Sequence, residues 1–336
     1  MNKLTIISNE RVSVNSNKEF KSTNLDLKVL PDELNLNYDV TCIFRKSQTE
    51  QNHLFDLKNI KVKANIFTFL LEIIKTVFIK NNRYLIVAIS PYTFLSFIIL
   101  VIFRKNIFIY LMSNGYEEYK HILGNKFVWI YSIMFNLVTK FSKVIVCHER
   151  LYDKEKSFLV SPSRLKSNWF QNISVPQVDK PKFLYVGRIN PEKGIENFIN
   201  LFSSSNINGK LSIAGNTDKL KIHSNKINLL GYVESEKELI NKYDENNISI
   251  LPSYTEAHPY VLEESLARKR PIIIFEDISY VKKDKIGVFV IKRNIEELIS
   301  ITNYILKNYS SIQQEMNNNK LPTMDQMIKE FSNILG

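Results

Sequence analysis

The stretch YTEAHPYVLEES, residues 254–265, holds three carboxylates, and the first and last of them, Glu256 and Glu264, have seven residues between them. It follows the strand-like run ISILP, and Pro259 marks the expected start of a helix. Glu256 should then lie in a loop and Glu264 in the second helical turn, with the backbone amides at the positive end of the helix dipole between them. This division suits a sugar nucleotide, because one carboxylate can accept from sugar hydroxyls and the other from the ribose diol. Glu263 is expected to point into solvent.

A second stretch, YVGRINPEKGIENF, carries two cations beside a turn. The strand is expected to end at Val186, Gly187 frees the turn, and Asn190 followed by Pro191 predicts a helix start. Arg188 and Lys193 would then converge on the amides of a helix N-terminus, which suits a diphosphate. The alternative is that both are solvated surface charges. Their position at the carboxyl end of a strand favours the phosphate site.

Composition restricts the other classes of function. The 336 residues predict two domains, and the net charge of +11 comes from scattered lysines without a recognised nucleic-acid motif, so no nucleic-acid partner is expected. An anionic membrane surface or phosphorylated small molecules suit this charge equally well. Two distant cysteines and five histidines without ligand spacing predict no metal site and no cofactor. The N-terminus lacks the apolar core of a signal peptide, which makes a cytoplasmic location the expectation.

The run from Tyr84 to Phe103 is uncharged for twenty residues, long enough to span a bilayer. Ser90-Pro91 divides it, however, and a strand, a helix and a second strand (IFIYLM) are the favoured interpretation. The segment from Asn65 to Arg83 is a second apolar helix with a basic end. One hypothesis is that both helices rest on the inner face of the cell membrane, with lysines meeting anionic headgroups. The alternative is two well-buried helices.

The pattern of strands and helices predicts an α/β fold with two Rossmann-like, doubly wound parallel sheets facing a central cleft. The predicted domains are residues 1–172, which would bind the acceptor, and 183–318, which would bind the nucleotide, with a linker at 173–182. A terminal helix at 319–336 is expected to pack back towards the N-terminal domain. No GxGxxG or GxxxxGK[ST] motif supports a dinucleotide site or a P-loop.

The motifs VGRINPEKG, LSIAGN, INLLGYV and LPSYTEAHPYVLEESLARKRPIII, in this order, resemble the retaining glycosyltransferases of the GT-B fold, in the group-1 (family-4) class. The resemblance is strong over about residues 183–275 and covers the N-terminal half only in its pattern of elements. The Arg–Lys pair and the Glu–Glu pair are specific together, whereas each alone would be weak.

The resemblance implies roles for single residues. Arg188 and Lys193 match the positions that hold the donor diphosphate, Glu256 the acidic residue near the transferred sugar, and Glu264 the one on the ribose. These enzymes need no metal, and the catalytic set would be Arg188, Lys193 and Glu256. The implied donor-binding set is Gly187, Gly231, Tyr232, Val233, Ala257, His258, Pro259, Tyr260 and Glu264.

Several positions depart from the family's pattern. Ala257 stands where the family has Gly after the first Glu, and Lys269 replaces the Gly before the strand PIIIF, which should alter that turn. The Gly-rich loop after the first strand is missing from IISNERVSVN, and Asn114 stands where a His often occurs. Ser90 and Asn114 are the candidates on the acceptor side.

The expected function is therefore retaining transfer of a sugar from a UDP- or GDP-sugar to a hydroxyl of a saccharide or lipid-linked acceptor, in surface polysaccharide, lipopolysaccharide or glycolipid synthesis. The alternative from another class is a non-catalytic GT-B protein that binds a nucleotide or lipid. A nucleotide-sugar epimerase of the same fold is a further alternative, which the spacing of the site residues disfavours.

Overall fold

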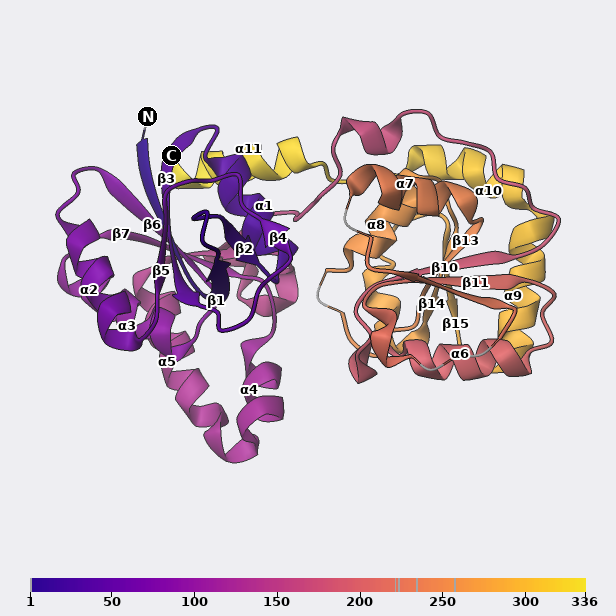
Figure 1. Ribbon diagram of the computed structural model, residues 1–336, viewed down its shortest axis with the longest axis horizontal. Helices are drawn as coiled ribbons and strands as arrows, with labels where there is room; N and C mark the ends of the chain where they lie inside the picture. The colour runs from indigo at the N-terminus through magenta and orange to yellow at the C-terminus, as the bar shows by residue number, and fades with distance from the viewer. Residues whose placement is uncertain (1, 221, 223, 234, 257) are drawn as a thin grey trace. The chain divides into compact units, whose positions relative to one another are not determined.

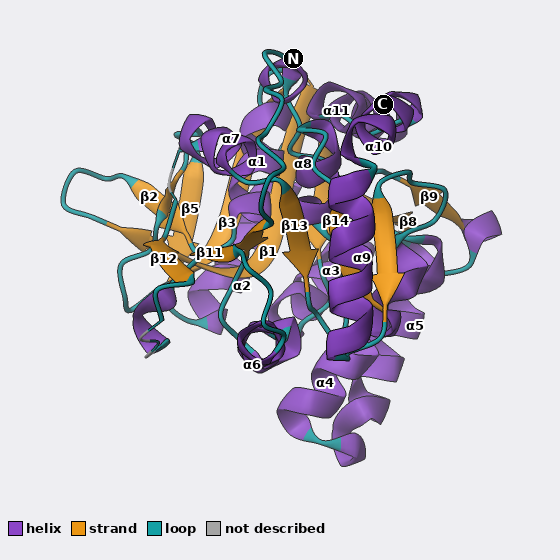
Figure 2. Ribbon diagram, turned by 90° about the vertical axis from the view of Figure 1, so that its right-hand side faces the viewer, coloured by secondary structure: helices purple, strands orange, loops and turns teal. Residues whose placement is uncertain are grey.

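The structure is a computed structural model that describes residues 2–220, 222, 224–233, 235–256 and 258–336 (Figures 1 and 2). Its contacts divide the chain into two compact units: unit 1 is Met1–Ser161 with Asp325–Gly336, and unit 2 is Pro162–Met324. Each unit is built on a mainly parallel sheet with helices packed against it. The predicted fold class, α/β with two Rossmann-like sheets, is confirmed.

Unit 1 is organised around β1, which pairs in parallel with β3 on one side and β6 on the other. The parallel order is β5-β3-β1-β6-β7-β8-β9, and β2 and β4 extend the sheet in antiparallel pairing from the far end of β1. The strands are β1 (Asn2–Val14), β2 (Phe20–Ser22), β3 (Tyr38–Lys46), β4 (His53–Leu54), β5 (Ile60–Lys63), β6 (Asn82–Val87), β7 (Asn106–Leu111), β8 (Lys143–Val146) and β9 (Ser157–Leu159).

Alternation along β7 shows how helices cover the sheet of unit 1. Ile109 points into a core shared with α2, α3 and α5, whereas the neighbouring Tyr110 meets the ring of Phe331 on α11 at 5.0 Å. Helices therefore pack on both faces, and the C-terminal helix belongs to this unit. The helices are α1 (Leu25–Leu34), α2 (Ile66–Val77), α3 (Pro91–Ile102), α4 (Gly115–Leu123), α5 (Val128–Phe141) and α11 (Met324–Leu335).

The long uncharged run forms a strand followed by a helix, as the favoured interpretation predicts. β6 ends at Val87, and α3 begins at Pro91. Ser90 caps the helix: its Oγ accepts from the amide of Thr93, while Thr93 Oγ1 accepts from the amide of Ser90. Among the described helices, none combines the length and the apolar character that crossing a bilayer requires.

Unit 2 contains a fully parallel sheet in the order β12-β11-β10-β13-β14-β15. Phe183 on β10 packs against Phe198 and Phe202 of α6, whereas its neighbour Leu184 packs on the other face with Tyr243 of α7 and Ala267 of α8. Figure 1 accordingly shows α6 on one side of these strands and α7 and α8 on the other. The elements are β10 (Lys182–Val186), α6 (Ile195–Ser204), β11 (Lys210–Ala214), β12 (Ile227–Gly231), α7 (Glu236–Glu245), β13 (Ile248–Leu251), α8 (Tyr260–Ala267), β14 (Ile272–Phe275), β15 (Val288–Ile291), α9 (Ile295–Lys307) and α10 (Tyr309–Glu315).

The helix after β10 begins later than the prediction at Asn190-Pro191. Pro191–Lys193 form a 3-10 turn, Gly194 then takes a left-handed conformation (φ 65°), and α6 starts at Ile195. Gly194 is required because the carbonyl oxygen of Pro252 would lie 2.1 Å from a Cβ atom at this position. Lys193 therefore precedes the α-helix, in a turn that contacts the chain just after β13.

The predicted linker, residues 173–182, lies inside unit 2, and the boundary falls earlier, between Ser161 and Pro162. Residues before 173 are bound to this unit by buried contacts. Trp169 packs against Tyr243, and its Nε1 donates to Glu236 at 2.7 Å. Two prolines and polar residues give this stretch a linker-like composition, but its backbone carbonyls are bonded to Arg268 and Arg270 of the α8–β14 turn.

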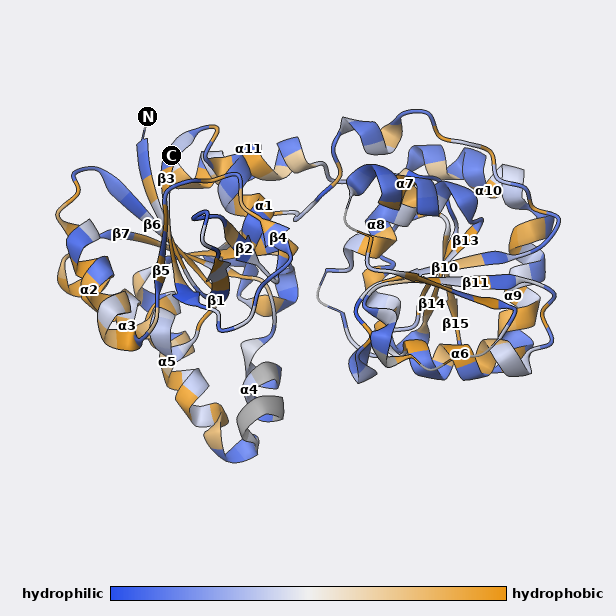
Figure 3. Cartoon of the chain, viewed as in Figure 1, coloured by the Kyte–Doolittle hydropathy of each residue, from blue (hydrophilic) through white to orange (hydrophobic). Residues whose placement is uncertain are grey.

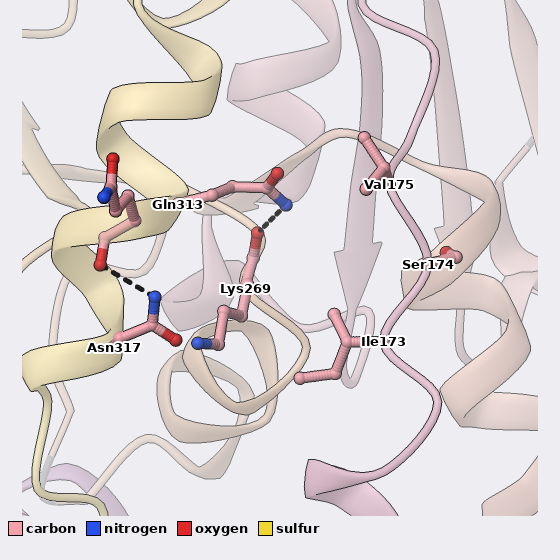
Figure 4. A pocket seen from close by; sticks show the side chains of 7 residues that line it. Ile173, Ser174, Val175, Lys269, Gln313 and Asn317 are labelled. Atoms are coloured by element: carbon pink, nitrogen blue, oxygen red, sulfur yellow. Dashed lines mark hydrogen bonds between the residues drawn. The ribbon is translucent and has the colours of Figure 1, made fainter.

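The α8–β14 turn carries a lysine in a conformation that favours glycine. Lys269 has a φ of 54°, and the amides of Lys269 and Arg270 donate to the carbonyls of Leu266 and Ser265, the pattern of a Schellman motif. Gln313 Nε2 donates to the Lys269 carbonyl at 2.9 Å, beside a shallow pocket of about 300 Å³ (Figure 4). The pocket is lined by Ile173, Ser174, Val175, Lys269, Gln313, Gln314 and Asn317.

Replacing Lys269 by Gly is expected to stabilise the protein by about 1 kcal/mol, because glycine adopts the left-handed conformation without a Cβ clash. The midpoint of urea unfolding, with unchanged slope, measures the gain. The control is Lys269→Gln, which removes the charge but keeps the backbone strain and should leave the midpoint unchanged. An equal gain in both variants would attribute the effect to the charge and contradict the backbone explanation.

Candidate functional site

The predicted carboxylate and one predicted cation meet above neighbouring strands. Glu256 lies in the loop between β13 and α8, and its Oε1 is 2.6 Å from Lys193 Nζ. Ser253 Oγ donates to the same oxygen, also at 2.6 Å. β10 and β13 are adjacent in the sheet, so the loops at their carboxyl ends lie side by side. Both partners are shielded, with Glu256 8% and Lys193 18% exposed.

Two residues from later in the chain hold this loop. The Tyr280 hydroxyl donates to the Glu256 carbonyl at 2.6 Å and accepts from the Glu256 amide at 3.0 Å. Arg293 Nη2 donates to the carbonyls of Pro252 and Ser253, and its guanidinium lies 4.1 Å from the centre of the Tyr254 ring. Neither residue belongs to a local motif, so no sequence pattern identifies them. Ser253 could have been recognised, because it lies three residues before Glu256.

The other predicted cation, Arg188, lies exposed at the end of β10. The Tyr185 hydroxyl donates to its backbone carbonyl at 2.6 Å, and its guanidinium makes no ion pair with a described residue. Burial would raise the pKa of the Glu192 carboxyl, but the Asn190 side-chain amide and the charges of Arg188 and Lys193 outweigh burial and lower it. The charges of Arg188 and Lys193 thus stabilise a negative charge in this turn.

A further pKa shows that the negative charge of Glu256 reaches the same turn. The pKa of the Tyr185 phenol is raised, mainly by burial and in addition by Glu256, whereas Arg188 acts in the opposite direction. Cationic and anionic groups thus occupy one end of β10. In the described part of the chain, no three His, Cys, Asp or Glu side chains are grouped where they could hold a metal ion.

Glu264 lies in the second turn of α8, as predicted, but its carboxylate is inside the unit. The side chain is 4% exposed, and the Tyr243 hydroxyl donates to its Oε2 at 2.9 Å. Burial and the adjacent carboxylate raise the pKa of the Tyr243 phenol well above its ordinary value, which keeps it protonated as a donor. The contact of Glu264 with a ribose stays a prediction.

The expectation that Glu263 points into solvent is wrong. Its side chain is 3% exposed, since α8 packs against β13, β14 and the turn at Ser167–Phe170, and every residue from Leu262 to Ala267 is buried. Its Oε2 lies 3.4 Å from Nε2 of His258, and neither atom has a hydrogen-bond partner among the described residues. The His258 ring in turn meets the Tyr260 ring edge-on at 5.2 Å. His258 and Tyr260 therefore form a half-buried cluster at the start of the helix.

The remaining predicted donor residues follow the carboxyl ends of neighbouring strands. The Gly187 amide donates to Ala214 at 3.0 Å and the Gly215 amide to Gly231 at 2.9 Å, so backbone bonds connect the ends of β10, β11 and β12. Tyr232 after β12 is exposed, and Val233 is half-buried. Pro259 is the N-cap residue of α8. Ala257 lies outside the described residues.

The two acceptor-side candidates are helix caps in unit 1. Ser90 caps α3, and Asn114 caps α4, with its Oδ1 accepting from the Tyr116 amide at 3.1 Å. They follow β6 and β7, which are adjacent strands, so both belong to one edge of the sheet. Their role towards an acceptor stays a prediction.

Comparisons with known proteins concern the family and the fold. Residues 168–321 match the family model "Glycosyl transferases group 1". A search of curated protein sequences finds no match. Solved structures of the same fold include a sucrose-phosphate synthase from Thermosynechococcus elongatus, with 13% identity, a TM-score of 0.66, and coverage of 99% of this chain and 98% of that one.

Two further solved structures cover nearly all of both chains. The Anabaena protein HepE, in complex with UDP and glucose, has 10% identity and a TM-score of 0.69, with 99% of each chain covered. The lipopolysaccharide outer core galactosyltransferase WaaB has 14% identity and a TM-score of 0.63, with 98% of each chain covered. At these identities the likeness shows the fold. The chain therefore has the GT-B fold, and its residues 168–321 match the model of the group 1 glycosyltransferases.

Proposed function

We propose that the protein is a retaining glycosyltransferase that moves a sugar from a UDP- or GDP-sugar to a hydroxyl of a saccharide or lipid-linked acceptor. The observation that carries the proposal is the contact of Lys193 with Glu256 at 2.6 Å, in the loops at two strand ends, one of which also carries Arg188, whose guanidinium makes no ion pair with a described residue. Two cations and one carboxylate thus lie at adjacent strand ends, in a region that matches the group 1 family model.

The cations would bind and stabilise the donor diphosphate. Arg188 presents a planar fork that matches two phosphate oxygens. Lys193 has three hydrogens to donate, so it can keep its bond to Glu256 and still reach a phosphate. Stabilising a leaving diphosphate by such fixed charges lowers a barrier by roughly 3–4 kcal/mol. Protein cations would replace a metal in this role, and the reaction is proposed to need none.

The sugar would lie against Glu256. The bond between the anomeric carbon and the diphosphate oxygen breaks with its electron pair leaving on the diphosphate, and the acceptor oxygen bonds to the anomeric carbon from the same face. The acceptor proton passes to a diphosphate oxygen, so no protein general base is assigned. Glu256 positions the sugar and stabilises its developing positive charge. The backbone amides of His258 and Tyr260 would donate hydrogen bonds to sugar hydroxyls.

Structural neighbours support this donor and suggest a kind of acceptor. HepE is solved with UDP and glucose, and WaaB is a lipopolysaccharide galactosyltransferase. We therefore favour synthesis of a surface polysaccharide, lipopolysaccharide or glycolipid, in the cytoplasm.

The test is to incubate the purified protein with a panel of UDP- and GDP-sugars and to follow donor loss and the anomeric signal of the product by NMR, with and without EDTA. The expected result is turnover of one donor, a product with the donor's anomeric configuration, and no effect of EDTA. Inversion would contradict retention, and loss of turnover in EDTA would contradict metal independence. Binding without turnover across saccharide acceptors would favour the non-catalytic alternative.

Replacing Tyr280 by Phe is expected to lower kcat/KM about tenfold, since the Glu256 amide and carbonyl lose their shared partner and the carboxylate is held less firmly. Turnover of the donor found in the panel measures the effect. The matched control is Tyr304→Phe, an exposed ring on α9 in the same unit, which should leave kcat/KM unchanged. An unchanged kcat/KM in Tyr280→Phe would show that this clamp does not position Glu256.

A further inference from the structure

The outward side of three helices in unit 1 is apolar. Of the 24 large hydrophobic side chains that the described part of the chain exposes, twelve lie on α2, α3 and α5 or at their ends. On α5, Trp129, Ile133, Leu137 and Phe141 recur every four residues and share one side of the helix; Trp129 is 62% exposed. Figure 3 shows the hydrophobic residues along these helices in orange. Exposed apolar patches of this kind mark sites of interaction.

The stripe on α5 continues across the neighbouring helices. α2 packs against α3, and α3 packs against α5. Phe67 and Leu71 are exposed one turn apart on α2, and Leu95, Ile98 and Ile102 share one side of α3. We name the exposed hydrophobic side chains of these three helices and their ends the apolar face. It faces away from the sheet, because the opposite sides of the same helices form the core.

The C-terminal ends of α2, α3 and α5 lie at one edge of the unit, since each helix leads into a strand of the same parallel sheet. Phe78 after α2 and Phe103 after α3 show this directly, because their exposed rings meet at 6.0 Å. The last turn of α5 and the segments that follow the three helices supply a row of cations along this edge, here named the basic edge: Lys80, Arg104, Lys105, Lys140 and Lys143. Lys80, Arg104 and Lys105 make no ion pair with a described residue.

The net charge of the segment that carries the basic edge favours one kind of binding partner over another. Residues 73–148 contain nine Lys and Arg against two Glu, a net +7 of the +11 of the whole chain. A second copy of the chain would bring like charges together at the basic edge, whereas an anionic surface would be attracted to it. Apolar side chains including a Trp, bordered by Lys and Arg, are the composition of an interfacial membrane-binding surface.

We propose that the apolar face and the basic edge together bind the surface of a bilayer that contains anionic lipid. The hydrophobic side chains of α2, α3 and α5 enter the boundary between headgroups and acyl chains, and the cations of the basic edge contact the headgroups. The surface is independent of the proposed sugar transfer, because no candidate donor residue lies on it. An assay without nucleotide or acceptor therefore tests it alone.

The experiment is co-sedimentation of the full chain with vesicles of phosphatidylcholine, with and without 30% phosphatidylglycerol. We expect wild type to bind the anionic vesicles only and to be released by 0.5 M NaCl. The variant Lys80→Glu, Arg104→Glu, Lys140→Glu should bind on the order of 100-fold more weakly, since each cation near such a surface contributes about a fivefold factor. The variant Ile102→Ser, Trp129→Ser, Ile133→Ser should bind the anionic vesicles at least about tenfold more weakly than wild type.

The matched control is Lys180→Glu, Lys210→Glu, Lys307→Glu, which makes the same change of net charge at exposed positions of unit 2 and should bind like wild type. Circular dichroism of each variant verifies the fold. The proposal is overturned if wild type does not bind anionic vesicles, or if the unit 2 control loses as much binding as the variant with three Glu substitutions on the basic edge. It is also overturned if the variant with three Ser substitutions on the apolar face binds like wild type. A wild-type dimer that the serine variant converts to a monomer, without vesicle binding, would assign the apolar face to self-association instead.

Discussion

Replacing Glu256 by Gln is expected to lower kcat for sugar transfer about 100-fold while the fold stays intact. The amide oxygen of Gln can still accept from Lys193 and Ser253, which both donate to Oε1 in the structure. What the variant loses is the negative charge beside the anomeric carbon, and fixed charges of this kind account for roughly 100- to 1,000-fold in rate. Steady-state kinetics with the donor identified by the panel measures the effect.

The prediction is specific because it assigns the whole loss of activity to kcat and none to KM. A loss confined to kcat indicates that the charge acts in the transition state, whereas a rise in KM alone would assign Glu256 to ground-state binding. Glu276→Gln, at an exposed position of the same unit, is the matched control and should keep wild-type kinetics. Wild-type kcat in Glu256→Gln would contradict the proposed role.

Replacing Arg268 by Met is expected to destabilise the protein by about 3–5 kcal/mol. The Arg268 side chain is 1% exposed, and its guanidinium donates to the carbonyls of Trp169 and Gln171 and to the carboxylate of Asp244. Methionine fills a similar volume but leaves these buried acceptors without their donor. Removing one partner of a buried polar network destabilises a protein more than replacing both partners. The midpoint of urea unfolding measures the loss.

Asp244 provides a check on this explanation, since Arg270 also contacts its carboxylate, at 3.3 Å. Asp244→Asn in the Arg268→Met background should recover part of the loss, because it removes a carboxylate that has lost its main partner. Lys307→Met, at an exposed position on α9, is the control and should shift the midpoint little. A shift in Arg268→Met as small as that of the control would mean that the network contributes little to stability.

The sequence predicted the parts of the fold that follow from local pattern. Short apolar runs became the strands of unit 2. Ser90-Pro91 correctly predicted where the uncharged run changes from strand to helix, because an N-cap residue and a proline at the first helical position act locally, within one helical turn. The approach of Lys193 to Glu256 was also predictable, since residues after adjacent parallel strands share one edge of the sheet. The late start of α6 was not, because it depends on the contact of Gly194 with the distant Pro252.

The errors share a cause in contacts between segments distant in sequence. Glu263 has the composition of a solvated helix position, yet α8 is buried on all sides by the sheet and its neighbours. Tyr280 and Arg293 support the Glu256 loop from 24 or more residues away, in segments without any motif. The predicted linker, residues 173–182, has the composition of a linker, but its Ser174 carbonyl is bonded to the buried Arg270 of unit 2.

The measurement that tests the central claim most directly is a calorimetric titration of UDP and GDP into wild type and Arg188→Ala, without magnesium. The diphosphate site predicts that wild type binds one of the two nucleotides and that Arg188→Ala binds it at least about tenfold more weakly, as expected when a hydrogen bond to a charged group is lost. Lys180→Ala, at an exposed position of the same unit, should bind like wild type. If neither nucleotide binds wild type, or if Arg188→Ala binds as tightly, the phosphate site at the end of β10 is contradicted.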